Sequence, residues 1–390
     1  MPPALLTLNA GSSSLKFAVY RPDAAGALHA LLRGQVDAIG AGACLRVTDG
    51  GERTDATVTA PDHAQALACV LDWLDARLPG LALHAAGHRI VHGGADYPHP
   101  VRVDAAVLAD LEKLIPLSPL HQPHGLAGIR ALARLRPDLP QVACFDTAFH
   151  HTLPPRARRF ALPREFAARG IRRYGFHGLS YEYIAGMLPE HLGDAADGRV
   201  VVAHLGNGAS LCALQARQSM ETSMSFTPLD GIPMATRCGA LDPGVLLHLL
   251  RTEGVSPAAL DDLLHHRAGL LGVSGLSGDV RTLLASDDPH AAEALELFAY
   301  RTAQAVAAHA VALGGLDALV FTAGIGEHAA PVRAAISRHL AWMGLALDAA
   351  ANMRHGPRIS APDSRMSAWV IPTDEESVIA RHAWALTAGT

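Results

Sequence analysis

Two stretches far apart along the chain share one pattern of apolar and polar positions. In the first, apolar runs at residues 5–8 and 15–20 flank a turn rich in Gly and Ser. In the second, apolar runs at 200–203 and 211–214 flank another Gly-rich turn. Short apolar runs bounded by turn residues are typical of strands, so each stretch predicts a β-hairpin. Two such hairpins indicate a duplicated domain, with a ligand held between the two copies.

Longer stretches with helical periodicity follow each hairpin. Residues 62–78 and 289–313 are rich in Ala and amphipathic, which predicts helices. Apolar runs at 142–145 and 318–321 predict further strands. Strands and helices in alternation favour a mixed α/β fold. The Pro- and Arg-rich stretch 153–170 is expected to carry the chain from one domain to the next.

The composition fits a globular protein of two domains. The 390 residues are 49% hydrophobic and 18% charged, with a net charge of −5. This balance gives no indication of nucleic acid or an anionic membrane surface as a partner. The five cysteines are scattered without a CxxC pair, which favours a reducing, cytoplasmic compartment. No basic leader follows Met1, and polar residues interrupt the apolar stretch 303–321, so no membrane span is expected.

Lysine and asparagine are rare, and several of them lie in Gly-rich turns. Asn9 and Lys16 flank the first turn, and Asn207 lies in the second. Backbone N–H groups, hydroxyls and an ammonium suit a phosphate, although the P-loop spacing is absent. An ordinary hairpin turn is the alternative for each. A third Gly-rich turn, 322–328, precedes a predicted helix and suits either close approach to a base or ribose or a simple helix cap.

Three motifs place a basic side chain beside glycines, and two place a carboxylate near an apolar run. The basic residues are Arg89, His177 and Arg237, whose alternative is an ordinary surface position. Asp146 follows the run 142–145, at a strand end where α/β sheets bind ligands or where a helix is capped. Glu375 could ligate Mg²⁺ or be solvated. The 22 histidines lack zinc-site spacing, so a dedicated transition-metal site is not expected.

Taken together, these motifs resemble the acetate kinase family of short-chain carboxylate kinases. The resemblance runs from end to end of the chain, and the motif wording and spacing are specific to that family. In the family's order, the motifs are NAGSSSLK, HRIVHGG, PLHQPH, FDTAFH, YGFHGLSY, HLGNGAS, PLDGIPMATRCGALDP, GLSGDVR, TAGIGEH and IPTDEE.

The resemblance implies a fold and a reaction. The fold is two duplicated domains of the sugar kinase, actin and heat-shock chaperone type with an interdomain nucleotide cleft. The domains would span 1–148 and 149–375, with a last helix at 376–390 packing back on the first. The protein would be a cytoplasmic homodimer that transfers the γ-phosphoryl group of ATP reversibly and in line to acetate, giving acetyl phosphate and ADP. Mg²⁺ would be required, with Mn²⁺ able to replace it.

Two alternatives stay open beside this reading. A propionate kinase would use the same mechanism, because a small apolar pocket discriminates one methylene by only about 1–3 kcal/mol. A non-catalytic, actin- or chaperone-like ATP switch would belong to another class, and it would not need Arg89 to bind a carboxylate.

The resemblance also implies roles for individual residues. Arg89 would bind the acetate carboxylate, and His177 and Arg237 would stabilise the transition state. Asp146 matches the catalytic acidic residue; because acetate is already ionised at pH 7, it is expected to orient arginine groups or metal-bound water rather than act as a general base. The remaining roles fall into three sets. Asn9 and Glu375 would support Mg²⁺; Val91, Leu120, Phe176 and Pro228 would line the acyl pocket; and the nucleotide would be bound by Lys16, His204, Leu205, Gly206, Asn207, Gly208, Asp279, Val280, Arg281, Gly324, Ile325, Gly326, Glu327 and His328.

The chain departs from the family's usual asparagine at three positions, Gln122, His328 and Asp374. All three fit the general shortage of asparagine in this sequence. His328 would lie near the adenine and could alter nucleotide preference. Asp374 adds a carboxylate beside Glu375, which is expected to strengthen the metal site.

Overall fold

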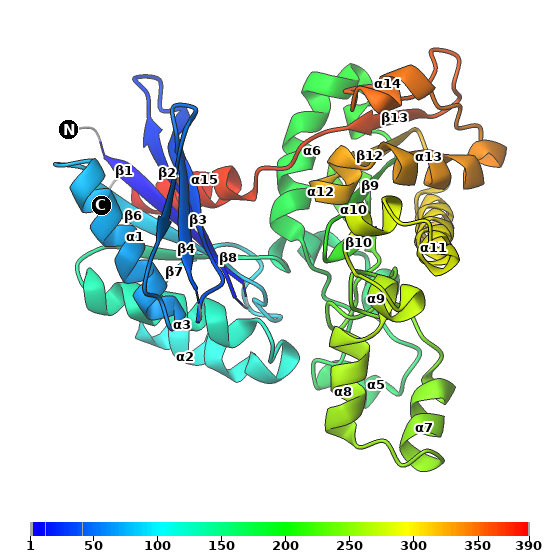
Figure 1. Cartoon of the computed structure of the whole chain (residues 1–390), viewed down its shortest axis with the longest axis horizontal. Helices are drawn as coiled ribbons and strands as arrows, with labels where there is room; N and C mark the ends of the chain where they lie inside the picture. Colours follow the sequence, from blue (N-terminus) through cyan, green and yellow to red (C-terminus); the bar gives the residue numbers. More distant parts are fainter. Residues whose placement is uncertain (1–2, 12, 41, 389–390) are drawn as a thin grey trace. The chain divides into compact units, whose positions relative to one another are not determined.

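The computed structural model describes residues 3–11, 13–40 and 42–388, and the chain divides into two compact units. The first comprises Met1–Phe149 with Asp374–Thr390, and the second comprises His150–Thr373. Each unit contains one sheet and its own helices (Figure 1). The hydroxyl of Ser12, which belongs to the first predicted phosphate turn, lies outside the described residues.

The first unit is built on an eight-stranded sheet in the order β5-β4-β3-β2-β1-β6-β8-β7. Strands β1 to β5 pair antiparallel in sequence, whereas β1, β6 and β8 pair parallel. The predicted first hairpin is confirmed as β1 and β2. The strands are β1 Ala4–Ala10, β2 Leu15–Pro22, β3 Leu28–Asp37, β4 Cys44–Asp49, β5 Glu52–Thr57, β6 Leu83–Ile90, β7 Val101–Arg102 and β8 Gln141–Phe145.

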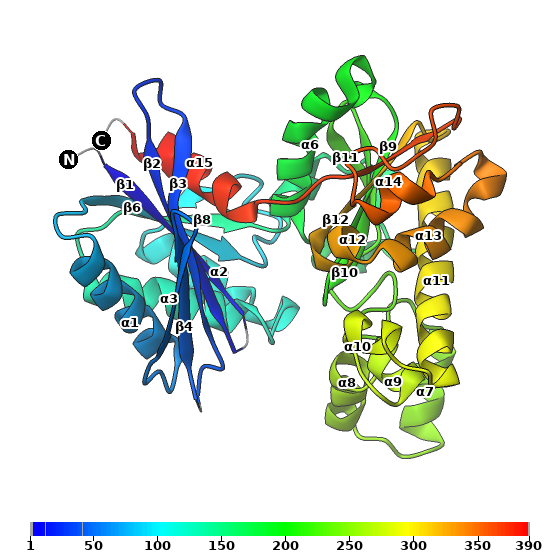
Figure 2. The same ribbon diagram turned by 45° about the horizontal axis from the view of Figure 1, so that its top comes forward.

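Helices cover both faces of this sheet. On one face α1 and α3 lie side by side and bury the apolar side chains of β1 to β4 (Figure 2). On the other face α15 packs against β6 and β1, directly over Gly87. A Cβ atom at Gly87 would overlap the Ile379 side chain of α15, so glycine is what allows this helix to approach the strand. The helices are α1 His63–Arg77, α2 Ala105–Lys113, α3 Gln122–Leu135 and α15 Glu375–Thr387.

The second unit repeats the central part of this topology. Its five-stranded sheet has the order β11-β10-β9-β12-β13, with an antiparallel hairpin of β9 and β10 and parallel pairing of β9, β12 and β13. The second predicted hairpin is therefore confirmed as well, and the repeated ladder supports the expected duplication. The strands are β9 Val200–Leu205, β10 Ala209–Gln215, β11 Gln218–Thr222, β12 Ala318–Thr322 and β13 Ser367–Val370.

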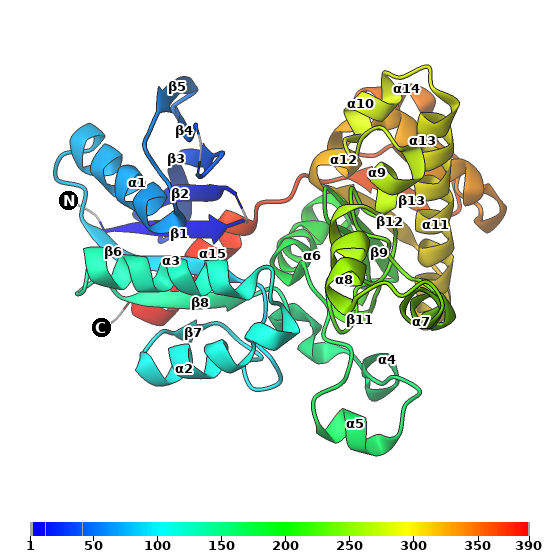
Figure 3. The ribbon, with the colours of Figure 1, turned by 60° about the horizontal axis from the view of Figure 1, so that its bottom comes forward.

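Helices α6 and α11 lie on opposite faces of the second sheet (Figure 3). Helix α11, at Pro289–Leu313, confirms the predicted helix, and the preceding Asp288 caps it by accepting a hydrogen bond from the His290 N–H. The other helices are α4 Pro155–Arg158, α5 Arg164–Ala168, α6 Gly178–Leu192, α7 Pro243–Arg251, α8 Pro257–His266, α9 Gly269–Ser274, α10 Val280–Leu284, α12 Ala323–His328, α13 Ala330–His339 and α14 Ala349–Met353.

Two local expectations differ from the structure. The stretch 153–170 was expected to connect the domains, but it lies inside the second unit and carries the short helices α4 and α5. The Gly-rich segment after β12 is not an open turn, because residues 323–328 form α12 directly after the strand. Among the described residues, no helix combines the length and the apolar character needed to cross a lipid bilayer.

Candidate active site

Three neighbouring parallel strands of the first unit end in polar side chains. Asn9 lies near the end of β1, Arg89 near the end of β6, and Asp146 directly after β8. Because β6 pairs with both β1 and β8, these ends meet at one edge of the sheet. The carboxyl edge of parallel strands is where open α/β sheets bind ligands.

The Arg89 guanidinium is held on two sides at this edge. Its Nε donates to Asp146 Oδ1 at 3.0 Å and its Nη2 to Asp146 Oδ2 at 2.6 Å, while its Nη1 donates to Asn9 Oδ1 at 3.1 Å. Burial alone would lower the pKa of Arg89, but the negative charges of Asp146 and Glu375 outweigh it and raise that pKa. Asp146 is itself buried. The pair therefore fixes the orientation of a charged guanidinium.

Glu375, the first residue of α15, lies beside the same arginine. Its Oε2 is 4.0 Å from Arg89 Nε, and its side chain is only 15% exposed. Burial raises the pKa of Glu375; Arg89 opposes this shift and Asp146 reinforces it. A raised pKa means that the surroundings do not fully compensate the carboxylate charge.

These groups fit a bound magnesium ion. The Asn9 amide oxygen and the Glu375 carboxylate are hard oxygen donors, and the uncompensated charge at Glu375 favours a cation. Among residues 3–11, 13–40 and 42–388, no set of three or more His, Cys, Asp or Glu side chains is arranged to hold a metal. Mg²⁺ is usually held through one or two protein carboxylates together with substrate phosphates, so a small protein ligand set suits it.

The expectation that Asp374 strengthens this metal site is not supported by its contacts. The Asp374 carboxylate accepts hydrogen bonds from Arg33 and Tyr20, on strands β3 and β2, and from the Ser377 N–H within α15. Its charge is therefore engaged by Arg33. The expected domain boundary at residue 375 would put Asp374 and Glu375 in the second domain. In the structure both residues belong to the first unit.

The residues expected to line the acyl pocket come from both units. Val91 follows β6 and is buried, and Leu120 is half-buried before α3. Phe176 and Pro228 are buried within the second unit. Gln122 is also buried, and it accepts a hydrogen bond from the His92 N–H and donates to the His92 carbonyl oxygen.

A cavity of about 720 Å³ in the second unit gathers many of the predicted nucleotide-binding residues. Its walls combine a Gly-rich turn, two arginines and an apolar side formed by α10 and the start of α13. The predicted residues that line it are Gly206, Asn207, Gly208, Arg237, Asp279, Val280, Arg281, Gly324, Ile325 and His328. A cavity of this size is in the usual range for small-molecule sites.

His177 and Arg237 converge on the turn at Gly208. A Cβ atom at Gly208 would lie 3.3 Å from His177 Nε2 and 3.6 Å from Arg237 Nη1. His177 has a φ of 57°, an unusual conformation for a residue with a side chain, and stands directly before α6. Its ring stacks on His204 with centroids 4.2 Å apart, and its Nδ1 is 2.8 Å from Ser210 Oγ. Three motifs that are distant in sequence thus meet around one glycine.

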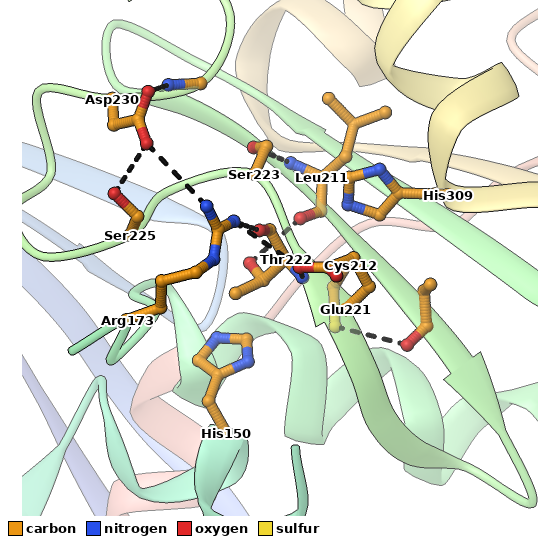
Figure 4. Close-up of polar contacts among 12 residues, drawn as sticks. His150, Arg173, Leu211, Cys212, Glu221, Thr222, Ser223, Ser225, Asp230 and His309 are labelled. Carbon is orange, nitrogen blue, oxygen red and sulfur yellow. Dashed lines mark hydrogen bonds and ion pairs between the residues drawn. The ribbon is translucent and has the colours of Figure 1, made fainter. Parts of the chain in front are cut away.

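Arg173 ties the segments that carry these two side chains (Figure 4). Its Nη2 donates to the Thr222 carbonyl oxygen at 2.6 Å, and its Nη1 lies 4.0 Å from Asp230 Oδ2. Asp230 also accepts a hydrogen bond from Ser225 Oγ at 2.5 Å. Arg173 precedes His177 by a few residues, and Asp230 precedes Arg237. This ion pair therefore links the chain segment before His177 to the segment before Arg237.

The remaining predicted nucleotide residues lie outside this cavity wall. His204 and Leu205 belong to β9 and are buried, and Gly326 and Glu327 belong to α12. Glu327 Oε1 accepts hydrogen bonds from the Ala323 and Thr373 N–H groups. Lys16 lies on β2 of the first unit, where it lines a different cavity of about 390 Å³.

Sequence reasoning missed the side chains that support the site. They are Ser210 beside His177, Ser180 beside His204, Arg173 beside Asp230, and Arg33 beside Asp374. Ser180 and Ser210 stand within recognised motifs, YGFHGLSY and HLGNGAS, so the motif wording could have identified them. Arg33 lies in an unremarkable strand and left no such signal.

Comparison with known proteins finds relatives along nearly the whole chain. A sequence model described as the Acetokinase family matches residues 4–381. A protein of Rhodopseudomonas palustris named acetate kinase is 54% identical over the full length of both chains.

Two solved structures are also similar over nearly the whole chain. A Francisella tularensis propionate kinase is 35% identical, covers 98% of this chain and 100% of its own, and superposes with a TM-score of 0.92. The Porphyromonas gingivalis acetate kinase is 36% identical, with 98% and 99% coverage and a TM-score of 0.86. These neighbours share the predicted two-domain α/β fold of the sugar kinase and actin type. The chain belongs to the Acetokinase family.

Proposed function

We propose that the protein transfers the γ-phosphoryl group of ATP reversibly to acetate, giving acetyl phosphate and ADP. The match to the Acetokinase family over residues 4–381 carries this proposal, and relatives at up to 54% identity are named acetate kinase. The main obstacle in such a reaction is charge, because a carboxylate must approach an anionic phosphate. Phosphoryl transfer therefore depends mostly on positioning and on neutralising charge.

Arg89 is the group that we propose to bind the acetate carboxylate. A guanidinium presents paired N–H donors that match a carboxylate, and the bonds to Asp146 and Asn9 fix its plane. Acetate is ionised at pH 7, so no proton has to be removed from it. Asp146 thus acts as a positioning residue for Arg89. The buried Val91 beside this site would contact the methyl group of the acid.

The cavity of the second unit is proposed to bind ATP. The Gly-rich turn 206–208 would approach the phosphates, and the apolar wall of Val280, Ile325 and Pro331 suits a base. His177 and Arg237 converge on Gly208, and they would offset the charge that develops on the transferring phosphoryl group. Asn9 and Glu375 would hold Mg²⁺, or Mn²⁺ in its place, which neutralises phosphate charge when bound.

For the assembly and location, we propose a cytoplasmic homodimer, as the family resemblance implies. Size-exclusion chromatography with light scattering measures the assembly directly. A mass of twice the chain's 40.9 kDa is expected.

The deciding experiment is an acid panel. Purified protein is incubated with ATP, Mg²⁺ and formate, acetate, propionate or butyrate, and acyl phosphate is trapped with hydroxylamine. Acetate is expected to give the most product, and none should form without Mg²⁺. An Arg89→Ala variant should lose the activity, whereas Arg53→Ala, at an exposed arginine of the same sheet, should keep it. ATP binding without acyl phosphate from any acid would contradict the proposal.

Propionate is the second candidate substrate, since the solved propionate kinase superposes with a TM-score of 0.92. One methylene changes binding in a small apolar pocket by about 1–3 kcal/mol, so propionate should react more weakly than acetate. A higher kcat/KM with propionate would change the preferred acid and leave the mechanism intact.

A further inference from the structure

Asp374, the residue before Glu375, joins the start of α15 to two strands of the first unit. Its Oδ1 accepts hydrogen bonds from Arg33 Nη1 at 3.0 Å and from Tyr20 Oη at 3.2 Å, and its Oδ2 accepts one from Arg33 Nη2 at 2.5 Å. The same carboxylate caps the helix by accepting from the Ser377 N–H at 3.0 Å. One side chain thus sets both the start and the direction of α15.

The partners of Asp374 are themselves fixed by the sheet. Tyr20 ends the buried run of β2, and Arg33 lies on β3, whose residues pair antiparallel with those of β2. The Arg33 guanidinium lies 5.7 Å from the centre of the Tyr20 ring, a cation–π distance. The Asp374 side chain is only 22% exposed, so this two-pronged ion pair is partly shielded from solvent.

We propose that the cluster of Asp374, Arg33 and Tyr20 is a positioning device for the Glu375 carboxylate. This inference rests on the proposed function, in which Glu375 holds the metal ion. Glu375 is the first residue of α15, so its backbone is placed by the residue that caps the helix. Its carboxylate must stay at the edge where Arg89 lies, 4.0 Å away. Without the cluster, the start of α15 would lose its hydrogen bonds to the side chains of β2 and β3.

The negative charge of Asp374 is what gives the cluster its strength, as a comparison with an asparagine side chain makes clear. An asparagine could still cap the helix, but it has one acceptor oxygen and no charge, so it could not form the two-pronged ion pair with Arg33. Residues that orient metal ligands typically change metal affinity or activity 10–100-fold when they are removed.

The test compares metal binding in matched arginine variants. Mn²⁺ is titrated into the protein with ADP present and no acid, and free Mn²⁺ is followed by electron paramagnetic resonance, so no turnover occurs. Arg33→Ala should weaken Mn²⁺ binding about tenfold, and Arg33→Lys should restore part of it. The control is Arg46→Ala on β4. Arg46 forms an ion pair with Asp37, is about as exposed as Arg33, and lines the same 390 Å³ cavity as Arg33 and Lys16. This control should bind Mn²⁺ like the unaltered protein.

Steady-state kinetics separate positioning from a general loss of structure. In Arg33→Ala the half-saturating Mg²⁺ concentration should rise about tenfold while KM for acetate changes little. Tyr20→Phe removes only one hydrogen bond and should shift Mg²⁺ dependence less, which keeps the inference testable if Arg33→Ala does not fold. Unchanged Mn²⁺ affinity in every folded variant would overturn the inference. If Arg33→Ala binds Mn²⁺ more weakly while the unaltered protein forms no acyl phosphate with any acid, the positioning role is supported and the proposed reaction is contradicted.

Discussion

Asp146 illustrates how the neighbours of one residue limit its chemistry. Both of its carboxylate oxygens accept hydrogen bonds from Arg89, and the side chain is buried. A carboxylate engaged in this way is poorly placed to accept a proton from substrate, and acetate has none to give at neutral pH. The contribution of Asp146 is therefore expected to be geometric, through the plane and position of the Arg89 guanidinium.

Asp146→Asn tests this role. The amide keeps the size of the side chain but cannot pair with Arg89 by charge, so the guanidinium should tilt from its position. A displacement of about 1 Å in a positioning group can cost on the order of 100-fold in rate, and we expect kcat/KM for acetate to fall by about that factor. KM for ATP should change much less, and Asp55→Asn, at an exposed ion pair, should be nearly silent. Full activity in Asp146→Asn would remove Asp146 from the mechanism.

Among the helices and strands, the packing of α15 against β6 has the most direct effect on the candidate site. Gly87 lets this helix approach the strand, while Val378, Ile379 and Ala383 bury its apolar side. Because Glu375 begins the same helix, a fault in its packing is transmitted to the candidate metal ligand.

Gly87→Ala is expected to destabilise the protein, because the added methyl group overlaps Ile379. Overpacking of a well-packed core typically costs about 1–3 kcal/mol, so the thermal midpoint should fall measurably. The double variant Gly87→Ala with Ile379→Ala makes room for the methyl group and should be less destabilised than the sum of the two single variants. Strict additivity in calorimetry would show that the two positions do not meet as described.

Helices and strands were predicted correctly from the sequence where the pattern of apolar and polar residues lies within the element itself. The strands of both hairpins and the helix α11 follow from apolar runs and helical spacing alone. Segment 323–328 was misjudged because two glycines indicate a turn, whereas burial against β9 and β12 favours a helix there. The return of α15 to the first sheet has no local signal, and only the family resemblance implied it.

The site was partly predictable for a similar reason. Motif wording singled out His177, Arg237 and Gly208, and their convergence depends on backbone folding that spacing does not encode. The direction of the Asp374 side chain was misjudged, because its sequence neighbour is Glu375 while its spatial partner, Arg33, lies on a distant strand. Contacts of this kind become visible only once the sheet is assembled.

At the scale of the whole molecule, the two units have sheets of similar topology. Each unit also buries histidine side chains that are uncharged at neutral pH. His88 in the first unit and His150 and His309 in the second are buried. Burial lowers the pKa of each imidazole to about 4. An exposed histidine in the unfolded chain titrates near 6.5. Each of these three groups therefore links folding to pH.

The sign of the linkage follows from proton binding. Between pH 6.5 and 4 the unfolded chain binds protons at these histidines and the folded chain does not, so acid favours unfolding. The stability that they contribute is present above pH 6.5 and is lost as the pH falls toward 4. Each histidine can contribute a slope of up to about 1.4 kcal/mol per pH unit. The thermal midpoint should therefore fall steeply as the pH drops below 6.5, and this fall adds to the one caused by protonation of carboxylates.

His88→Gln is the direct test of this linkage. Whatever the variant costs in stability at pH 7.5, its thermal midpoint should fall less between pH 6.5 and 5 than that of the unaltered protein, because one buried site no longer distinguishes the two states. The matched control is His290→Gln, an exposed histidine at the start of α11, which should keep the full pH dependence. Equal slopes for His88→Gln and the unaltered protein would mean that His88 is protonated in the folded state, against the burial of its ring.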